Sequence, residues 1–308
     1  MVWSRTGILS VNKEESTFTA TMPGFDDVLF FSSTSGTTVS GLSNPHLAYR
    51  LDQGPILIST GKVRQPSDEK TLFTEARESV TSEYKKYGEL SEVYNAIHTV
   101  VSWNTIWTPY EGLVTPVSRG WSWPANYVLF DWDNYFVSYM YGIVDKELAY
   151  SNVIQVTKSR TIDGFVPNFS SGTDKSRDRT EPTVGSRVVY ELWNKFGDDW
   201  LIDLLFDDLF NWLDWIWTHR RLPPLNLVCL GSDPNMPDSE RENYMQGARY
   251  ESGLDNSPMY DSPPVEYNNT MHKMMLYDVG MTALFITECQ VLSEIATKTG
   301  RSSQAALL

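Results

Sequence analysis

The chain has 308 residues, 41% hydrophobic and 21% charged, and contains no low-complexity tract, as expected for a globular protein with a sizeable core. Its formal net charge of −14 repels phosphate backbones and anionic lipid, which argues against binding to nucleic acid or to a membrane surface. Aromatic residues make up 13% of the chain. They suit a carbohydrate cleft, where rings stack on sugar faces, or a core that uses aromatic side chains for bulk.

The sequence lacks the signals of several other classes of protein. No apolar stretch looks long enough to span a membrane, and the N-terminus lacks the apolar run of a signal peptide, so the sequence assigns no compartment. The four histidines form no HExxH pattern, and Cys229 and Cys289 show no zinc-ligand spacing. We therefore expect no cofactor and no resident metal. The segment 232–235, Ser-Asp-Pro-Asn, is either a set of calcium ligands or an ordinary turn.

Residues 1–65 have the pattern of β-strands. Short runs at 16–21, 28–31 and 55–59 are separated by clusters of Gly, Ser, Thr and Pro. Because this β-rich segment begins without a clear start, we expect residues 1–65 to be the C-terminal part of a β-sandwich-like domain.

Helical periodicity dominates from Ser67, which is a good helix N-cap. The predicted helices are 68–87, 91–105, 134–147, 148–160, 184–196, 198–219 and 273–298. The long connections 106–133, 161–183 and 220–272 hold most of the Trp-Asp, Arg-Asp and Glu-Ser-Gly patterns, and connections of this length usually carry function. Helical hairpins in series, with long loops at one end, predict a mainly α fold for residues 66–308, the N-terminal portion of an incomplete (α/α)6 toroid.

The first loop motif is Trp-Ser-Trp-Pro at 121–124, followed by Phe-Asp-Trp-Asp-Asn-Tyr-Phe at 130–136. Trp121, Trp123 and Trp132 are candidate stacking surfaces for a sugar, and Asp133 is a candidate ligand for its hydroxyl groups. Alternatively, Asp133 is simply the N-cap of the helix that follows.

The second motif spans residues 171–185, in which charged residues alternate just before a predicted helix. Arg179 and Glu181 are candidate substrate-binding residues in this motif. The alternative is a solvated surface with weak ion pairs, which is the usual meaning of a charge run.

The third motif is Gln-Gly-Ala-Arg-Tyr-Glu-Ser-Gly-Leu-Asp-Asn-Ser-Pro-Met-Tyr-Asp at 246–261. It places Glu251 and Asp255 four residues apart, with Gly253 and Asn256 beside them. Two carboxyl groups in such a loop suit acid–base chemistry, and apolar neighbours such as Leu254 can keep one of them protonated. A turn closed by an Asx cap is the alternative.

The three motifs, in this order and with helical hairpins between them, resemble glycoside hydrolase family 63 over roughly residues 66–300. This family includes α-glucosidases and mannosylglycerate hydrolases. The resemblance implies a six-hairpin glycosidase fold and inverting hydrolysis of an α-glucosidic or α-mannosidic bond at the end of an oligosaccharide or small glycoside. Trehalases have the related pattern Glu-Ser-Gly-Trp-Asp, from which this chain departs because Leu254 stands in place of Trp.

The resemblance also implies roles for individual residues. Asp255 matches the general acid, and Trp132 and Asp133 match positions that hold the non-reducing sugar. Glu251 and Gly253 match residues that shape the loop around the acid. At position 181 related enzymes often have Gln rather than Glu, so the contact of this residue with a sugar is less well supported.

In the family the general base is a Glu far beyond the acid, so we expect the base to be missing from this chain. Glu288 and Glu294 lie in the predicted helix 273–298, and we expect neither to be the base. Residues 301–308 look like a weakly structured tail. The chain is then a fragment that is inactive alone. A sugar-binding relative without catalysis and a trehalase-like hydrolase are the alternatives.

Overall fold

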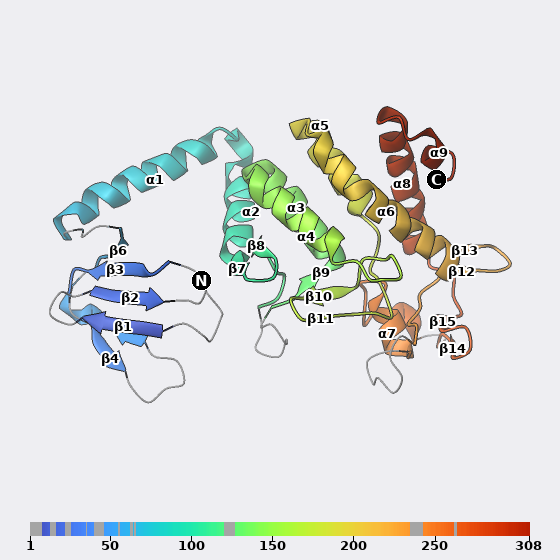
Figure 1. Cartoon of the computed structure of the whole chain (residues 1–308), viewed down its shortest axis with the longest axis horizontal. Helices are drawn as coiled ribbons and strands as arrows, with labels where there is room; N and C mark the ends of the chain where they lie inside the picture. The colour runs from blue at the N-terminus through green and yellow to red at the C-terminus, as the bar shows by residue number, and fades with distance from the viewer. Residues whose placement is uncertain are drawn as a thin grey trace. The chain divides into compact units, whose positions relative to one another are not determined.

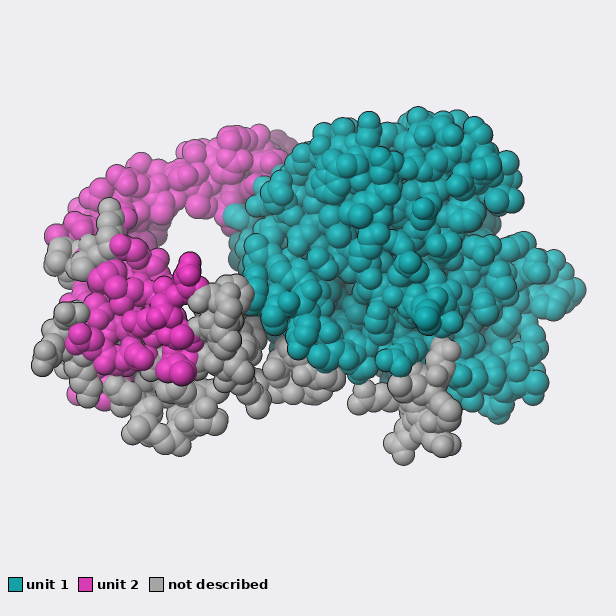
Figure 2. Space-filling view, in the orientation of Figure 1, with its two compact units in different colours: residues 1, 97–308 teal, residues 2–96 magenta. Residues whose placement is uncertain are grey.

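The computed structural model divides into two compact units, residues 2–96 and residues 97–308 (Figure 2). It describes residues 8–12, 17–21, 26–34, 36–39, 46–54, 56–61, 64, 66–119, 127–234, 243–261 and 264–308.

The first unit contains an antiparallel sheet and a long helix. The sheet has the strand order β1-β2-β3-β6, with β1 Ile8–Asn12, β2 Thr17–Thr21, β3 Val28–Ser32 and β6 Ile58–Thr60. Phe18 pairs with Phe30 across β2 and β3, and their rings stack with centroids 4.7 Å apart. Two further strands, β4 Thr37–Val39 and β5 His46–Ala48, pair separately, and α1 spans Glu69–Lys85. The sheet confirms the strand-rich character of this region, while the assignment of residues 1–65 to a β-sandwich stays a prediction.

The second unit consists of helices joined by loops that carry short strands. Its helices are α2 Ser91–Asn104 (which begins in the first unit), α3 Asp131–Val144, α4 Lys146–Lys158, α5 Gly185–Phe196, α6 Asp199–His219, α7 Met245–Tyr250, α8 Val279–Lys298 and α9 Ser302–Ala305. The strands are β7 Ile106–Thr108, β8 Gly112–Val114, β9 Leu129–Phe130, β10 Phe169–Ser171, β11 Asp174–Lys175, β12 Arg221–Leu222, β13 Leu227–Val228, β14 Tyr267–Asn268 and β15 Lys273–Met274.

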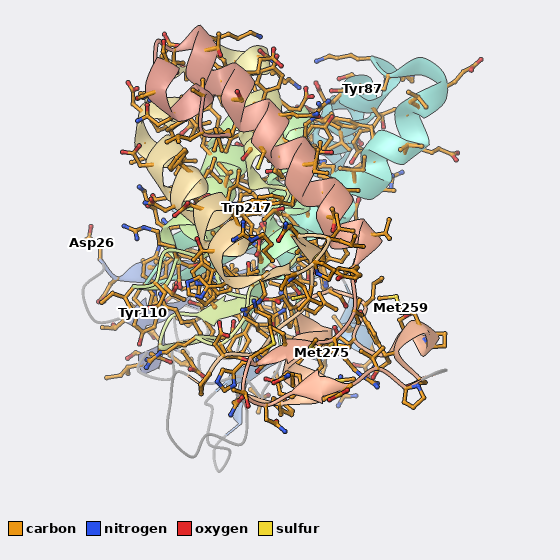
Figure 3. All side chains as sticks on the ribbon, turned by 90° about the vertical axis from the view of Figure 1, so that its right-hand side faces the viewer. Asp26, Tyr87, Tyr110, Trp217, Met259 and Met275 are labelled. Atoms are coloured by element: carbon orange, nitrogen blue, oxygen red, sulfur yellow. The ribbon has the colours of Figure 1, made fainter. Side chains whose placement is uncertain are left out.

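The core of this unit lies between the helices. On α6 the residues Leu201, Leu205, Leu209, Trp212 and Ile216 are all buried, and their spacing places them on one helical face. Burying a side chain of this size stabilises the folded state by about 1.5–3 kcal/mol relative to leaving it exposed. The hairpin α3–α4 and the pair α5–α6 pack in sequence around this core, and α8 packs on both α5 and α6. Figure 3 shows α8 crossing α6 on this side of the molecule.

The fold is mainly α, preceded by a small β-rich segment, which confirms the predicted fold class. Consecutive helical hairpins of this kind are the units from which an (α/α)6 toroid is built. The loops with β9–β11, α7 and β14–β15 lie on one side of these helices (Figure 1). This side therefore collects the described parts of the three motifs.

Several element boundaries differ from the predictions. Helix α3 begins at Asp131 rather than 134, and α8 begins at Val279 rather than 273 because Lys273–Met274 pairs with β14. Helix α7 lies inside a connection predicted to be irregular, and α9 lies in the predicted tail.

The prediction that no stretch is long and apolar enough to span a membrane is wrong for α8. By length and composition, Val279–Lys298 is long and apolar enough to cross a membrane, with a mean hydropathy of 1.3. However, Leu292 and Ile295 on this helix are buried in the core. Because core helices pass the same test, this is weak evidence for a membrane span.

Candidate active site

The first and third motifs meet where Trp132 lies against Gly253. Trp132 is in the first turn of α3, and Gly253 follows α7 with φ +67°, a conformation that favours glycine. A Cβ atom at Gly253 would overlap the indole and lie only 2.8 Å from its Cε2. The half-buried indole therefore forms one wall of the loop that carries Asp255.

The first and second motifs meet around Asp131. Its Oδ2 accepts hydrogen bonds from Thr180 Oγ1 at 3.2 Å and from the Glu181 amide at 3.3 Å. In turn, Glu181 Oε2 accepts a bond from the Trp132 amide at 3.3 Å. Both carboxyl groups are buried at the N-terminus of α3, where the helix dipole favours negative charge. The two loops are thus joined by reciprocal backbone and side-chain bonds.

These carboxyl groups influence one another's protonation. Burial raises the pKa of Asp131 well above its ordinary value, and the neighbouring charge of Glu181 raises it further. Burial also raises the pKa of Glu181 strongly, and the charges of Asp133 and Asp255 add to that effect. The carboxyl groups of Asp133, Glu181 and Asp255 therefore lie close enough to interact, although they come from three different motifs.

Asp255 is half-buried rather than directed into bulk solvent. Burial raises its pKa, and the positive charge of Arg179 opposes this effect. The apolar side chains near it in the loop, Leu254 and Met259, are themselves 52% and 46% exposed. Asp133 is also half-buried, and burial raises its pKa as well.

The charge run of the second motif is largely buried. The Arg179 guanidinium donates to both oxygens of Asp178 at 2.9 Å and lies 5.0 Å from the centre of the Tyr250 ring. Asp178, Arg179 and Glu181 are each at most 6% exposed. The alternative of a solvated surface is therefore wrong for this part of the run, although Arg177 is exposed.

Glu251 is buried in the loop that carries Asp255, residues 251–261, which we call the acid loop. Its Oε2 accepts from Arg220 Nε at 2.6 Å, and its Oε1 accepts from the Thr180 amide at 3.1 Å. Burial lowers the pKa of Arg220, but the charges of Glu251 and Asp233 raise it by more. No sequence motif marks Arg220, because one Arg at the end of a helix carries no distinctive pattern.

The remaining candidates fall in different places. Trp121 and Trp123 lie outside the described residues, and Asn256 is exposed. Asp133 is not the N-cap of α3, because Phe130 occupies that position. In the candidate calcium segment, Asp233 is instead paired with Arg220 at 3.0 Å. Among the residues that the structure describes, no group of three or more His, Cys, Asp or Glu could hold a metal ion.

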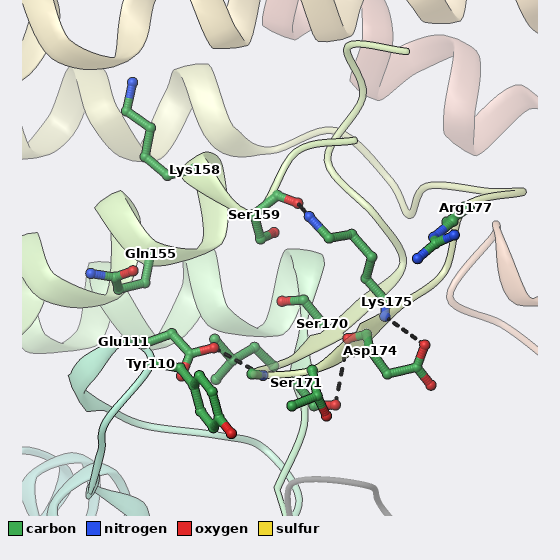
Figure 4. Close-up of a pocket in the computed structure, with 13 residues that line it drawn as sticks. Tyr110, Glu111, Gln155, Lys158, Ser159, Ser170, Ser171, Asp174, Lys175 and Arg177 are labelled. Carbon is green, nitrogen blue, oxygen red and sulfur yellow. Dashed lines mark hydrogen bonds between the residues drawn. The ribbon is translucent and has the colours of Figure 1, made fainter. Parts of the chain in front are cut away.

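Two separate pockets lie in the second unit. One, of about 390 Å³, is lined by polar residues of β11 and the end of α4, where Lys175 Nζ donates to the Ser159 carbonyl at 2.6 Å (Figure 4). Its other lysine, Lys158, pairs with Asp208 at 2.5 Å, so both ammonium groups are already bonded within the unit. The second, of about 490 Å³, is mainly apolar and lies beside Trp217 (Figure 3). Neither contains Asp255.

Asp255 is a half-buried carboxyl group with a raised pKa, in a loop whose Gly253 packs on the Trp132 indole, and these features suit acid catalysis at a sugar site. On a fold of helical hairpins, these features indicate a mainly α glycoside hydrolase. The model of the mannosylglycerate hydrolase MGH1-like glycoside hydrolase domain, of the family 63 type, matches residues 126–308. The chain belongs to this family, as the sequence resemblance predicted.

Other comparisons are more distant. No curated protein is significantly similar in sequence. An uncharacterized conserved protein from Thermus thermophilus has 21% identity and a TM-score of 0.49, over 66% of this chain and 57% of that one. The family 63 mannosylglycerate hydrolase from the same organism, solved in complex with glucose, has 18% identity and a TM-score of 0.41, over 68% of this chain and 51% of that one. The chain thus spans little more than half the length of either.

Proposed function

We propose that this chain carries the proton-donating part of an inverting, exo-acting glycoside hydrolase, with Asp255 as the general acid. The bond cleaved is α-glucosidic or α-mannosidic, in an oligosaccharide or a small glycoside. The observation that supports this proposal best is the position of Asp255. It is half-buried with a raised pKa, and its charge acts on Glu181. Its loop packs on Trp132 through Gly253.

In this mechanism Asp255 is protonated when substrate binds and donates its proton to the departing glycosidic oxygen. The raised pKa keeps a larger fraction of Asp255 protonated near neutral pH, which is the requirement for a general acid. The Trp132 indole stacks on the sugar ring, while Asp133 accepts hydrogen bonds from its hydroxyl groups. The charges of Asp133 and Asp255 both act on Glu181, so Glu181 is included in the same sugar site.

An inverting enzyme also needs a base, roughly 6.5–9.5 Å from the acid, to activate water on the opposite face of the sugar. Two glutamates after Asp255 are already engaged in the fold. Glu288 accepts bonds from the amides of Ser186 and Arg187 at the start of α5, and Glu294 pairs with Lys298.

Glu266, the third glutamate after Asp255, is exposed beside β14. We propose that none of these three glutamates is the base and that the base is not part of these 308 residues. The chain alone then binds glycosides without hydrolysing them.

Isothermal calorimetry tests binding to the chain, with methyl α-glucoside, methyl α-mannoside and mannosylglycerate as ligands. The last is included because the family description names it. Trp132→Ala and Asp133→Asn should weaken binding, whereas Asp261→Asn, at an exposed residue of the same loop, should not. Equal affinities for all variants would overturn the site, and robust hydrolysis of an aryl α-glucoside by the chain alone would overturn the absence of a base.

The acid itself is tested in a form of the protein that hydrolyses glycosides. Asp255→Asn removes the proton donor, so hydrolysis of a glycoside with a poor leaving group should fall by about 100-fold or more. A glycoside with an activated leaving group needs less proton donation and should lose less. An unchanged rate on the poor leaving group would refute Asp255 as the acid.

A further inference from the structure

Arg220 directly follows the last residue of α6 and is wholly buried, without being one of the motif residues. Its guanidinium lies 4.5 Å from the centre of the Trp215 ring, which covers one of its faces. A buried charge is costly unless it is paired and hydrogen-bonded, so its partners determine what it does.

The guanidinium binds three separate segments at once. Nε donates to Glu251 Oε2 at 2.6 Å, Nη1 to Asp233 Oδ2 at 3.0 Å, and Nη2 to the Asp178 carbonyl at 3.0 Å. These partners belong to the third motif, to the loop after β13 and to the second motif. The planar fork of Arg suits this use, because its donors point in fixed and different directions.

Glu251 extends the connection from Arg220 to the neighbouring backbone. It accepts a bond from the Gly231 amide at 2.6 Å and another from the Thr180 amide at 3.1 Å. Asp178 in turn accepts a bond from Ser232 Oγ at 2.6 Å. The second motif, the loop after β13 and the acid loop are therefore held to one another around a single cation.

This cluster lies next to the residues proposed to act on the substrate. Glu251 precedes Asp255 by four residues, and Thr180 lies between Arg179 and Glu181 in the chain. Arg179 and Asp255 interact electrostatically, as do Glu181 and Asp255. A shift of Glu251 relative to Thr180 would therefore change how the acid faces both residues.

We propose that Arg220 is a positioning residue that fixes Asp255 relative to Arg179 and Glu181 by holding the acid loop against the second motif. This proposal rests on the proposed function only in naming Asp255 as the acid. Arg220 touches no substrate in this scheme, and it acts through Glu251 and the Asp178 backbone.

Three variants perturb this position in different ways. Arg220→Met removes the charge and all the bonds, whereas Arg220→Lys keeps the charge but cannot form the fork. Gly231→Ala leaves Arg220 intact and displaces it, because a Cβ atom at Gly231 would lie 2.7 Å from Arg220 Cζ. Asp208→Asn is the matched control, since Asp208 is a buried partner of Lys158 and Arg160 on the side of α6 that faces α4.

The experiment measures the titration of Asp255 by carboxyl carbon NMR in the full chain, together with its affinity for methyl α-glucoside and its thermal midpoint. Burial is the main cause of the raised pKa of Asp255, so we expect this pKa to fall towards its ordinary value in Arg220→Met and Gly231→Ala. Affinity for methyl α-glucoside should fall as well, because the binding residues are no longer held in one geometry. Arg220→Lys should lie between these variants and the wild type. Asp208→Asn should lower the midpoint without changing either quantity.

The proposal is overturned if the Arg220 and Gly231 variants lower the midpoint as Asp208→Asn does but leave the Asp255 titration unchanged. If Arg220→Met does not fold, Arg220→Lys and Gly231→Ala decide the question. Failure of the wild-type chain to bind any glycoside would count against the proposed function, while the Asp255 titration would still report on Arg220.

Discussion

Replacing Gly253 by Ala tests the contact between the acid loop and Trp132. Two costs are expected. The first is the positive φ of +67°, which costs a residue with a Cβ atom about 1–2 kcal/mol. The second is the overlap of the new Cβ atom with the Trp132 indole. The Phe136 ring, with its centroid 6.0 Å from that of Trp132, lies beside this indole. Overpacking of this kind costs about 1–3 kcal/mol, so the variant should lose about 2–5 kcal/mol of unfolding free energy.

Gly197→Ala is the matched control for the first cost. Gly197 has φ +71° at the end of α5, in the same unit, and a Cβ atom there would have no neighbour within 4 Å. It should lose only this first cost, about 1–2 kcal/mol. The difference between the two variants therefore isolates the cost of the contact with Trp132.

Urea denaturation followed by far-ultraviolet circular dichroism measures both losses, and calorimetry with methyl α-glucoside measures the effect on binding. Gly253→Ala should also weaken sugar binding, because the indole must move to admit the methyl group, whereas Gly197→Ala should leave binding unchanged. Equal losses of stability in the two variants, or wild-type sugar binding by Gly253→Ala, would refute the contact between Gly253 and Trp132.

Further predictions concern pH dependence, a buried hydroxyl and the stacking surface. Burial raises the pKa of Glu288 to about 7 from an ordinary value of 4.5, so the native state holds a proton that the unfolded state releases. The free energy of unfolding should therefore fall by about 3 kcal/mol as the pH rises from about 4.5 to about 7. In Glu288→Gln this fall should disappear from urea titrations at pH 5 and pH 8, and parallel profiles would contradict it. Thr180→Val leaves the Trp212 indole N–H without its acceptor at 2.8 Å and should cost about 1–3 kcal/mol in urea, whereas Thr180→Ser should cost less; equal stability of all three proteins would contradict this. Trp132→Ala should reduce glycoside affinity by about tenfold in calorimetry, while Trp217→Ala, at a half-exposed indole on α6, should not, and equal losses would argue against stacking on Trp132.

Much of the fold follows from local patterns in the sequence. The apolar residues of α6 recur at helical spacing, and Gly197 ends α5 in the left-handed conformation, as expected of a glycine after a helix. Helix boundaries were less predictable where strand pairing replaced the helix, since Lys273 has no local feature that excludes it from a helix. Its strand conformation comes from pairing with Asn268.

The sequence by itself determined the helices, the order of the three motifs and the family, because periodicity and motif spacing are properties of the chain alone. Only the tertiary structure decided which charged residues are buried. In the sequence an ordinary charge run contains Asp178, Arg179 and Glu181. The packing of α3 and the acid loop nevertheless removes these side chains from water. The same packing brings Arg220 to Glu251 and Asp178. Desolvation and pairing depend on residues distant in the chain, so no local pattern encodes them.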